Sequence, residues 1–146
     1  MHLFVTLSLD GYFEGLNHDL SWHNVDDEFN KFAIEQLRET GLILFGRRTY
    51  QLMEGFWPKA AVDPIRHLKE MPGKDIWVGT SDLALSFIKE DLIDEFRFMI
   101  NPVVVRGGRR IFEGLNRKLD LELTESRKFY SGNVLLYYRP RRKGEV

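Results

Sequence analysis

The stretch Leu42-Ile43-Leu44-Phe45-Gly46-Arg47-Arg48-Thr49 decides the fold class of this chain. Its first four residues form a wholly apolar run, which is typical of a strand buried on both faces of a sheet. Gly46 then supplies a turn that leads into a short predicted helix. The same order returns in a second unit. The apolar run Ile76-Trp77-Val78 is followed by the turn Gly79-Thr80-Ser81 and then by a predicted helix over residues 82–89. Two strand-turn-helix units predict an α/β fold with a largely parallel sheet.

The chain before this stretch is predicted to hold a strand, a loop and an amphipathic helix. Residues 3–9 are apolar and rich in β-formers, and Asp10-Gly11 supplies the turn that ends the strand. The loop is expected to extend to His23. Apolar residues then recur at helical spacing, which predicts a helix capped by Asn24 and stopped by Gly41.

The last third of the chain is predicted to add antiparallel strands. Residues 95–101 alternate, and the bulky side chains on one side should pack on a helix or meet a partner subunit; they are Phe96, Phe98 and Ile100. Residues 119–123 alternate again. Ser131-Gly132-Asn133 predicts a hairpin between residues 128–130 and 134–138. We therefore expect one domain over residues 1–140, followed by a basic tail at 141–146.

Composition excludes several classes of function. The 146 residues, 43% of them hydrophobic, suffice for one core, and the net charge of -1 gives no excess field for nucleic acid or a membrane surface. The absence of cysteine removes disulfides and thiolate nucleophiles, and with no signal or membrane-spanning run we expect a cytoplasmic protein. His18 and His23 bracket Asp19 without further obvious ligands, so no metal site is expected.

Two turns are candidates for holding phosphate groups. Gly46-Arg47-Arg48-Thr49 stands at a predicted helix start, where free backbone N–H groups and arginine side chains can bind an anion. Gly79-Thr80-Ser81 occupies the equivalent place in the second unit. The alternatives are a tight turn with solvated arginines in the first case and an ordinary helix cap in the second.

Other candidates lie at the predicted strand ends and in the first loop. Asp10 follows a strand and Glu95 begins one, so either carboxylate could deliver protons or could merely form a turn. Gly107-Gly108 would let the backbone approach a ligand closely, or would serve a turn. Trp22 could stack on a planar substrate with His23, or could pack over the core.

Taken in order, five motifs resemble the reductase domain of the riboflavin biosynthesis deaminase-reductase family, especially its stand-alone bacterial relatives. They are Ser8-Leu9-Asp10-Gly11, Leu44-Phe45-Gly46-Arg47-Arg48-Thr49-Tyr50, Pro72-Gly73-Lys74-Asp75-Ile76, Leu92-Ile93-Asp94-Glu95 and Asn101-Pro102-Val103-Val104, with the closing Ser131-Gly132-Asn133-Val134. The resemblance runs from about residue 3 to residue 139. It implies a dihydrofolate-reductase-like three-layer fold, with helices on both faces of a mainly parallel sheet and a C-terminal antiparallel hairpin.

The resemblance also implies a cofactor, a reaction and a homodimer. NADPH would bind along the carboxyl edge of the sheet, with its phosphates near two sets of residues: Gly46, Arg47, Arg48 and Thr49, and Gly79, Thr80, Ser81, Asp82 and Leu83. Leu9, Asp10 and Gly11 would line the substrate end, with Glu95 nearby. The family reaction passes a hydride from the nicotinamide to the sugar C1 of a phosphoribosylamino-pyrimidine, and an acid completes the proton balance.

Two departures from the family pattern leave other interpretations open. Thr80 stands where relatives usually carry a small residue, and only residues 59–71 separate Pro58 from Pro72, where relatives have a further strand. The cofactor site could be impaired, residues 60–69 could form a replacement, or the sequence could have been shortened. A pterin reductase remains an alternative, because Trp22 and Asp27 have the spacing of the substrate residues of dihydrofolate reductases. A non-catalytic binding or regulatory domain is the other alternative.

Arg47→Ala is expected to weaken NADPH binding roughly 10- to 150-fold, since a charge-assisted hydrogen bond to a phosphate contributes about 1.5 to 3 kcal/mol. The thermal midpoint without ligand should hardly move, because a solvated turn arginine contributes little to stability. A fluorescence titration with NADPH measures the first effect and a melting curve the second. Unchanged affinity would assign this turn a purely structural role.

Overall fold

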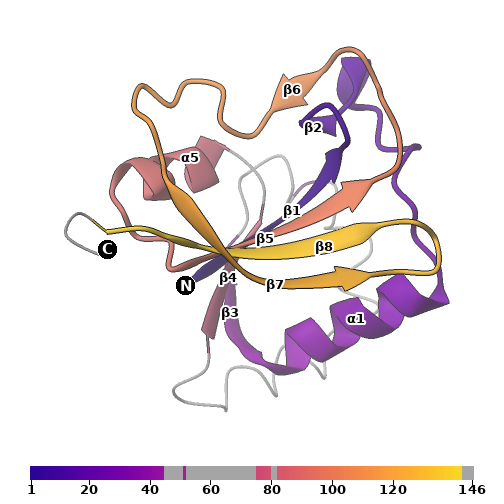
Figure 1. Cartoon of the computed structure of the whole chain (residues 1–146), viewed down its shortest axis with the longest axis horizontal. Coiled ribbons are helices and arrows are strands. Elements are labelled where there is room, and N and C mark those ends of the chain that lie inside the picture. The colour runs from indigo at the N-terminus through magenta and orange to yellow at the C-terminus, as the bar shows by residue number, and fades with distance from the viewer. Residues whose placement is uncertain (45–50, 52–74, 80–81, 143–146) are drawn as a thin grey trace.

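The computed structural model describes residues 1–44, 51, 75–79 and 82–142, which form a three-layer α/β fold (Figure 1). A six-stranded sheet has the order β3-β4-β1-β5-β8-β7. Its first four strands are parallel to one another, and β8 and β7 are antiparallel to their neighbours. The strand bounds are β1 His2–Ser8, β3 Thr40–Leu44, β4 Asp75–Val78, β5 Glu95–Asn101, β7 Leu121–Lys128 and β8 Val134–Pro140.

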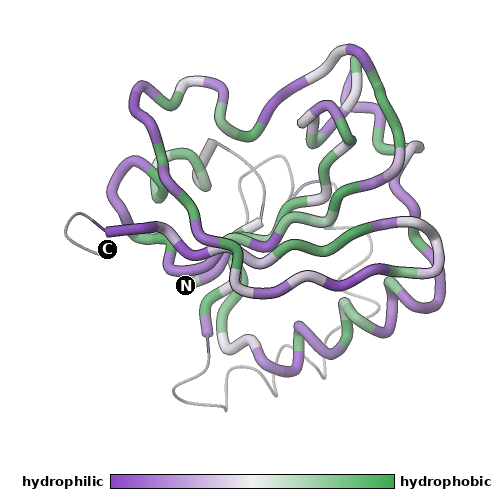
Figure 2. The backbone as a smooth tube through the Cα atoms, in the orientation of Figure 1, coloured by the Kyte–Doolittle hydropathy of each residue, from purple (hydrophilic) through white to green (hydrophobic). Residues whose placement is uncertain are grey.

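One described helix covers each face of this sheet (Figure 1). The helix α5 (Asp82–Lys89) buries Ala84 and Ile88 in a core with alternate residues of β1 and β5. The helix α1 (Asp27–Arg38) packs Phe32 against Met99 on the other face, and in Figure 2 its turns alternate between apolar and polar residues. The predicted fold class, a dihydrofolate-reductase-like arrangement with helices on both faces, is confirmed.

Alternation along β5 divides its side chains between the two cores. The predicted shared face of Phe96, Phe98 and Ile100 is confirmed, because all three belong to the core beneath α5. Met99 points to the α1 side and is fully buried there. The three apolar side chains therefore pack inside the fold. They cannot form the surface through which the sequence suggested that two subunits would meet.

Among the described strands, β3 is an outer one, and its side chains are mostly not buried, so the prediction that residues 42–45 form a strand buried on both faces is wrong for the described part. Leu42 is 50% exposed, and in this strand only Thr40 is fully buried. A wholly apolar run of four residues does not reveal strand order, because that order depends on pairing with distant segments. Phe45 and the helix predicted after it lie outside the described residues.

The boundaries of α1 differ from the predicted ones at both ends. Asp26 is the N-cap, and its carboxylate accepts a hydrogen bond from the Phe29 amide at 2.9 Å. The helix ends at Arg38, so Gly41 does not stop it and lies inside β3. Asn24 is not a cap, because its backbone N–H donates to the side chain of Asn101 and its side chain bonds Asn133.

The C-terminal hairpin forms at the predicted turn. Gly132 has φ +89°, and the Phe129 amide donates to the Asn133 carbonyl at 2.8 Å, which joins β7 to β8. The alternating segment expected at 119–123 and the hairpin arm expected at 128–130 overlap a single strand, β7, whose last six residues are exposed. Arg142 of the expected tail lies within 3.4 Å of Asp94, and residues 143–146 lie outside the described residues.

The predicted loop up to His23 contains one strand of a small ribbon. The strand β2 (Tyr12–Glu14) pairs with β6 (Arg109–Arg110), and the short 3-10 turn Leu16–His18 follows β2 along the chain. Gly108 has φ +133°, and a Cβ placed there would lie 2.0 Å from the Glu14 carbonyl oxygen. The glycine pair at 107–108 thus allows close approach of the chain's own backbone, which supports the turn alternative over ligand contact.

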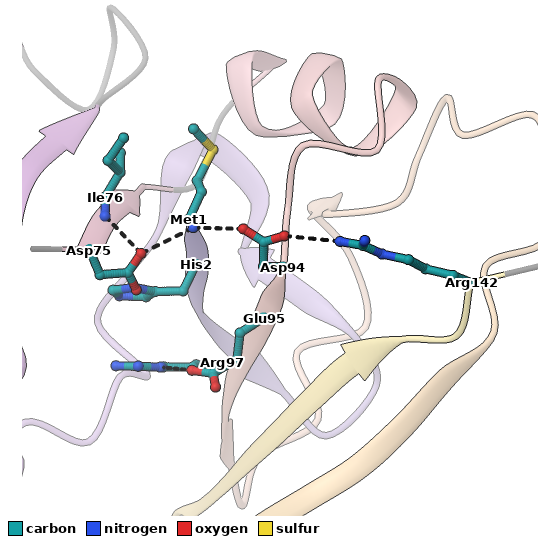
Figure 3. Close-up of polar contacts among 8 residues, drawn as sticks. All are labelled: Met1, His2, Asp75, Ile76, Asp94, Glu95, Arg97 and Arg142. Atoms are coloured by element: carbon teal, nitrogen blue, oxygen red, sulfur yellow. Dashed lines mark hydrogen bonds and ion pairs between the residues drawn. The ribbon is translucent and has the colours of Figure 1, made fainter. Parts of the chain in front are cut away.

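Polar side chains join three parallel strands at the amino edge of the sheet (Figure 3). The amine of Met1 lies 3.0 Å from Asp75 and 2.9 Å from Asp94. The buried His2 ring bonds Asp75 through Nδ1, and burial lowers the pKa of His2 while the hydrogen bond from His2 helps to lower that of Asp75. Both lowered pKa values are consistent with a neutral His2 imidazole that donates a hydrogen bond from Nδ1 to an ionised Asp75.

Gly108→Ala is expected to lower the free energy of unfolding by roughly 2 to 4 kcal/mol, because both the positive φ and the Glu14 carbonyl oppose a side chain there. Gly11→Ala is the matched control, since Gly11 has φ +88° but no atom within 4 Å of the place where a Cβ would stand. That change should cost about 1 to 2 kcal/mol. Urea unfolding of the two variants checks the order, and equal losses would contradict it.

The lowered pKa of His2 predicts a loss of stability in mild acid. The unfolded chain takes up a proton near the ordinary value of 6.5, whereas the folded chain resists it, so stability falls as the pH drops below about 7. His2→Phe should flatten this part of the curve of unfolding free energy against pH. Above about pH 7.5 the difference in unfolding free energy between the parent and His2→Phe should stay constant. If the two curves instead run parallel down to about pH 5.5, His2 is not the source of the acid sensitivity.

Candidate functional site

The turns that follow β1 and β4 meet at the carboxyl edge of the sheet, because these strands are parallel neighbours. After β1 the chain passes over one face through α1 to reach β3, and after β4 it passes over the other face through α5 to reach β5. Connections that leave neighbouring strands toward opposite faces open a crevice between their first turns. This edge is therefore the place where the fold offers a ligand site.

The turn after β1 is organised around Asp10. The Ser8 hydroxyl donates to Asp10 Oδ1 at 2.6 Å, and the backbone N–H groups of Val105 and Arg106 donate to the same carboxylate at 3.2 and 3.0 Å. The Leu9 amide donates to the Val103 carbonyl at 2.8 Å. These bonds tie the predicted residues Leu9, Asp10 and Gly11 to the segment that follows β5.

The hydrogen bond from the Ser8 hydroxyl, followed by those from the Arg106 and Val105 amides, lowers the pKa of the Asp10 carboxyl below its ordinary value. Asp10 is consequently ionised near neutral pH. An ionised carboxylate surrounded by donors can accept hydrogen bonds, but it has no proton to deliver. This environment opposes the predicted use of Asp10 as a proton donor.

Glu95 does not lie beside Asp10, so the expectation that both carboxylates share one site is wrong. In the parallel pair of β1 and β5, Glu95 stands opposite His2, whereas the turn with Asp10 follows Ser8 and Asn101 at the other end. A residue that begins one parallel strand and a residue that follows another always face opposite edges of a sheet. Glu95 instead bonds Arg97 at 2.5 Å within the amino-edge cluster (Figure 3).

The predicted phosphate turns are described only in part. Gly79 is buried, and its N–H donates to the Leu44 carbonyl at 2.8 Å, so this amide continues the β3–β4 pairing and is occupied. Asp82 and Leu83 are the first residues of α5. The other predicted phosphate contacts lie outside the described residues; they are Gly46, Arg47, Arg48, Thr49, Thr80 and Ser81.

A cavity of about 320 Å³ lies between α5 and the β2–β6 ribbon, which Figure 1 shows on the same side of the sheet. Phe13, Leu85 and Gly108 contribute to its lining together with Arg109 and Arg110. The guanidinium of Arg110 lies 4.7 Å from the centre of the Tyr12 ring and donates to the Tyr12 hydroxyl at 3.1 Å. The cavity therefore combines apolar walls with charges of both signs, since Glu113 belongs to its lining beside the two arginines, and the arginines could bind an anionic group of a ligand.

A network of asparagines holds the loop with Trp22 against the carboxyl edge. Asn101 and Asn133 are buried, and both bond Asn24, which follows the Trp22-His23 pair. Trp22 is half-buried, and its Nε1 donates to the Asp19 carbonyl at 3.0 Å. Asp27 is exposed at the first position of α1. Both predicted substrate residues thus stand at this edge, and their contact with a substrate stays a prediction.

Sequence analysis missed the residues that shape this edge with Asp10. The pattern Ser8-x-Asp10 is a usable signal, since such residues commonly bond within a turn. The arginine pair after Gly107-Gly108 is a second signal. The left-handed backbone of Arg106, with φ +65°, has none, because a long side chain gives no reason to expect it.

The described residues show neither a metal-binding cluster nor a membrane-spanning helix. No group of three or more His, Asp or Glu side chains within them lies close enough to hold a metal ion. No helix in residues 1–44, 75–79 and 82–142 is long and apolar enough to cross a membrane.

Comparison with known proteins assigns the chain to a family. The family model for the RibD C-terminal domain matches residues 60–135, just over half of the chain. The uncharacterized protein YyaP of Bacillus subtilis (strain 168) is 28% identical over 175 aligned positions, which cover 93% of this chain and 92% of YyaP. Because 93% of 146 residues is about 136, roughly forty of those 175 positions hold no residue of this chain.

Solved structures share the fold at low identity. A putative riboflavin biosynthesis protein from Shewanella sp. PV-4 superposes with a TM-score of 0.71 at 21% identity, and the match covers 97% of this chain and 98% of that one. A deaminase/5-amino-6-(5-phosphoribosylamino)uracil reductase from Thermotoga maritima superposes with a TM-score of 0.69 at 12% identity, over 96% of this chain and 56% of the other. The chain belongs to the RibD C-terminal domain family, on a dihydrofolate-reductase-like fold.

Proposed function

We propose that this protein is an NADPH-dependent reductase of a small heterocycle-linked substrate, of the kind that the reductase domain of riboflavin biosynthesis acts on. The observation that carries the proposal is where the family match falls. Residues 60–135 contain Gly79 and the start of α5, which follow β4 at the carboxyl edge, together with the arginines that line the cavity between α5 and the ribbon. The family match thus spans both the turn after β4, where the fold offers a ligand site, and the cavity beside α5.

The residues present fit a dinucleotide phosphate. The first amides of a helix have no partner within the helix, so the N–H groups of Asp82 and Leu83 at the start of α5 could hold phosphate oxygens. Arg110 can add a charge-assisted bond from the ribbon. The Gly46-Arg47-Arg48-Thr49 turn would supply the second set of contacts. When bound, the nicotinamide supplies the hydride.

The chain's own part in the reaction is to orient the substrate and to exclude water. Leu9 and Val104 are exposed apolar side chains at the carboxyl edge, where a planar ring could cover them. Trp22 lies in the loop beside this edge. Asp10 is ionised and accepts hydrogen bonds from Ser8 and Arg106, so it holds no proton to donate, and the proton that balances hydride transfer would come from another donor such as solvent.

The shortened middle of the chain bears on cofactor choice. The roughly forty aligned positions that hold no residue of this chain support the interpretation that it lacks a family segment, for which residues 59–71 are the expected place. Loss of adenosine contacts would reduce discrimination between NADPH and NADH unless Arg66 or Lys69 reaches the 2'-phosphate. Retained NADPH preference after Arg66→Ala and Lys69→Ala would refute that replacement.

A titration with NADPH, followed by energy transfer from Trp22, Trp57 and Trp77, tests the proposal. Arg110→Ala should weaken binding about tenfold or more, because it removes a cation from the cavity. Arg142→Ala is the matched control, since Arg142 pairs with Asp94 at the opposite edge and its loss should leave the affinity unchanged. Turnover of a phosphoribosylamino-pyrimidine rather than dihydrofolate would separate the riboflavin branch from a pterin reductase.

Two results would contradict this proposal. A parent protein that binds no nicotinamide nucleotide would assign the fold to a non-catalytic binding or regulatory domain. Equal losses in Arg110→Ala and Arg142→Ala would remove the cavity between α5 and the ribbon from the cofactor site. Sedimentation at high micromolar concentration checks the homodimer that the family resemblance leads us to expect.

A further inference from the structure

We propose that Asp10 is a positioning residue, whose carboxylate holds the segment after β5 so that Leu9 and Val104 form one apolar wall against a planar ring of the ligand. The inference deepens the proposed function and rests on it. It concerns how the carboxyl edge is shaped, and it replaces the role of proton donor with one carried out through other residues.

The contacts of Asp10 are those of a clasp between two chain segments. Its two carboxylate oxygens accept hydrogen bonds from the backbone N–H groups of Val105 at 3.2 Å and Arg106 at 3.0 Å. These residues are 95 and 96 positions away along the chain. The Ser8 hydroxyl donates to Oδ1 at 2.6 Å and itself accepts the Tyr12 amide at 3.0 Å. Both oxygens are therefore used by the protein in orienting its backbone.

The clasp coincides with a strained residue. Arg106 has φ +65°, a left-handed conformation that a residue with a Cβ adopts at a cost. Such strain persists only where surrounding contacts hold it. The described contact that fixes the Arg106 amide is the one to Asp10, so the clasp accounts for the conformation.

The clasp presents two apolar side chains to solvent at the same edge. Leu9 stands between the bonded residues Ser8 and Asp10 and is 66% exposed, and Val104 stands next to the bonded Val105 and is 57% exposed. The bond from the Leu9 amide to the Val103 carbonyl brings the two segments together. Two exposed apolar side chains held by a fixed backbone at the carboxyl edge could pack against the flat face of a heteroaromatic ring.

Asp10→Ala and Asp10→Asn test the inference against a catalytic role. Asn keeps one acceptor oxygen, so the dissociation constant for NADPH or the KM for the heterocyclic substrate should rise in the order parent, Asn, Ala, by about tenfold for Ala. The pH dependence of kcat should not change. Hydrogen exchange at the Val105 and Arg106 amides should accelerate in the same order.

Arg106→Gly provides a rescue, because glycine adopts the left-handed conformation without strain. Added to Asp10→Ala, it should recover part of the lost affinity. Asp26→Ala is the matched control: it also removes a carboxylate that accepts a backbone amide, but at the start of α1, and it should lower the melting temperature without weakening ligand binding.

Leu9→Ser and Val104→Ser identify the ring. Weaker binding of NADPH with unchanged binding of 2'-phospho-ADP-ribose, which lacks nicotinamide, would assign the wall to the cofactor ring, and a raised substrate KM alone would assign it to the substrate. The inference is overturned if folded Asp10→Ala binds both ligands like the parent, or if Asn and Ala abolish kcat equally with affinity intact. A parent that binds no nucleotide overturns the proposed function, and the wall with it.

Discussion

Parallel pairing of β1 with β5 over seven residues is the constraint on which the rest of the molecule depends. It places β1 inside the sheet, between β4 and β5, and assigns alternate side chains of β1 to the two cores. It also fixes which polar groups meet at each edge. His2 faces Glu95 at the amino edge, and Ser8 faces Asn101 at the carboxyl edge.

Each edge then uses its polar groups differently. At the amino edge, charged groups neutralise one another. The Met1 amine forms ion pairs with Asp75 and Asp94, and Arg97 forms one with Glu95. At the carboxyl edge, neutral amides of Asn101 and Asn133 fasten the loop, and one carboxylate, Asp10, binds backbone N–H groups.

Local patterns predicted much of the fold. The period-two alternation of β5, the hairpin at Gly132 and the helix α5 all depend on residues close together in sequence, and all three are present. The errors arise where distant pairing decides. The outer position of β3, the use of Asn24 in a network with Asn101, and the separation of Glu95 from Asp10 follow from strand order, which one sequence does not reveal. The sequence pattern pointed to the carboxyl edge as the candidate site, and Ser8-x-Asp10 signals the turn there, but nothing in the pattern predicts that Asp10 accepts the Val105 and Arg106 amides or that Arg106 is left-handed.

The exposed strand β7 has a consequence for how the molecule behaves in concentrated solution. An outer strand offers unpaired backbone groups to any second chain, which is the usual start of edge-to-edge aggregation. Along β7, Glu122 is paired with Arg139 on the neighbouring strand and Arg127 reaches Glu28 on α1, so charged side chains line the strand. A foreign strand that docked here would have to desolvate these ion pairs, and the sheet is therefore protected against growth at this border.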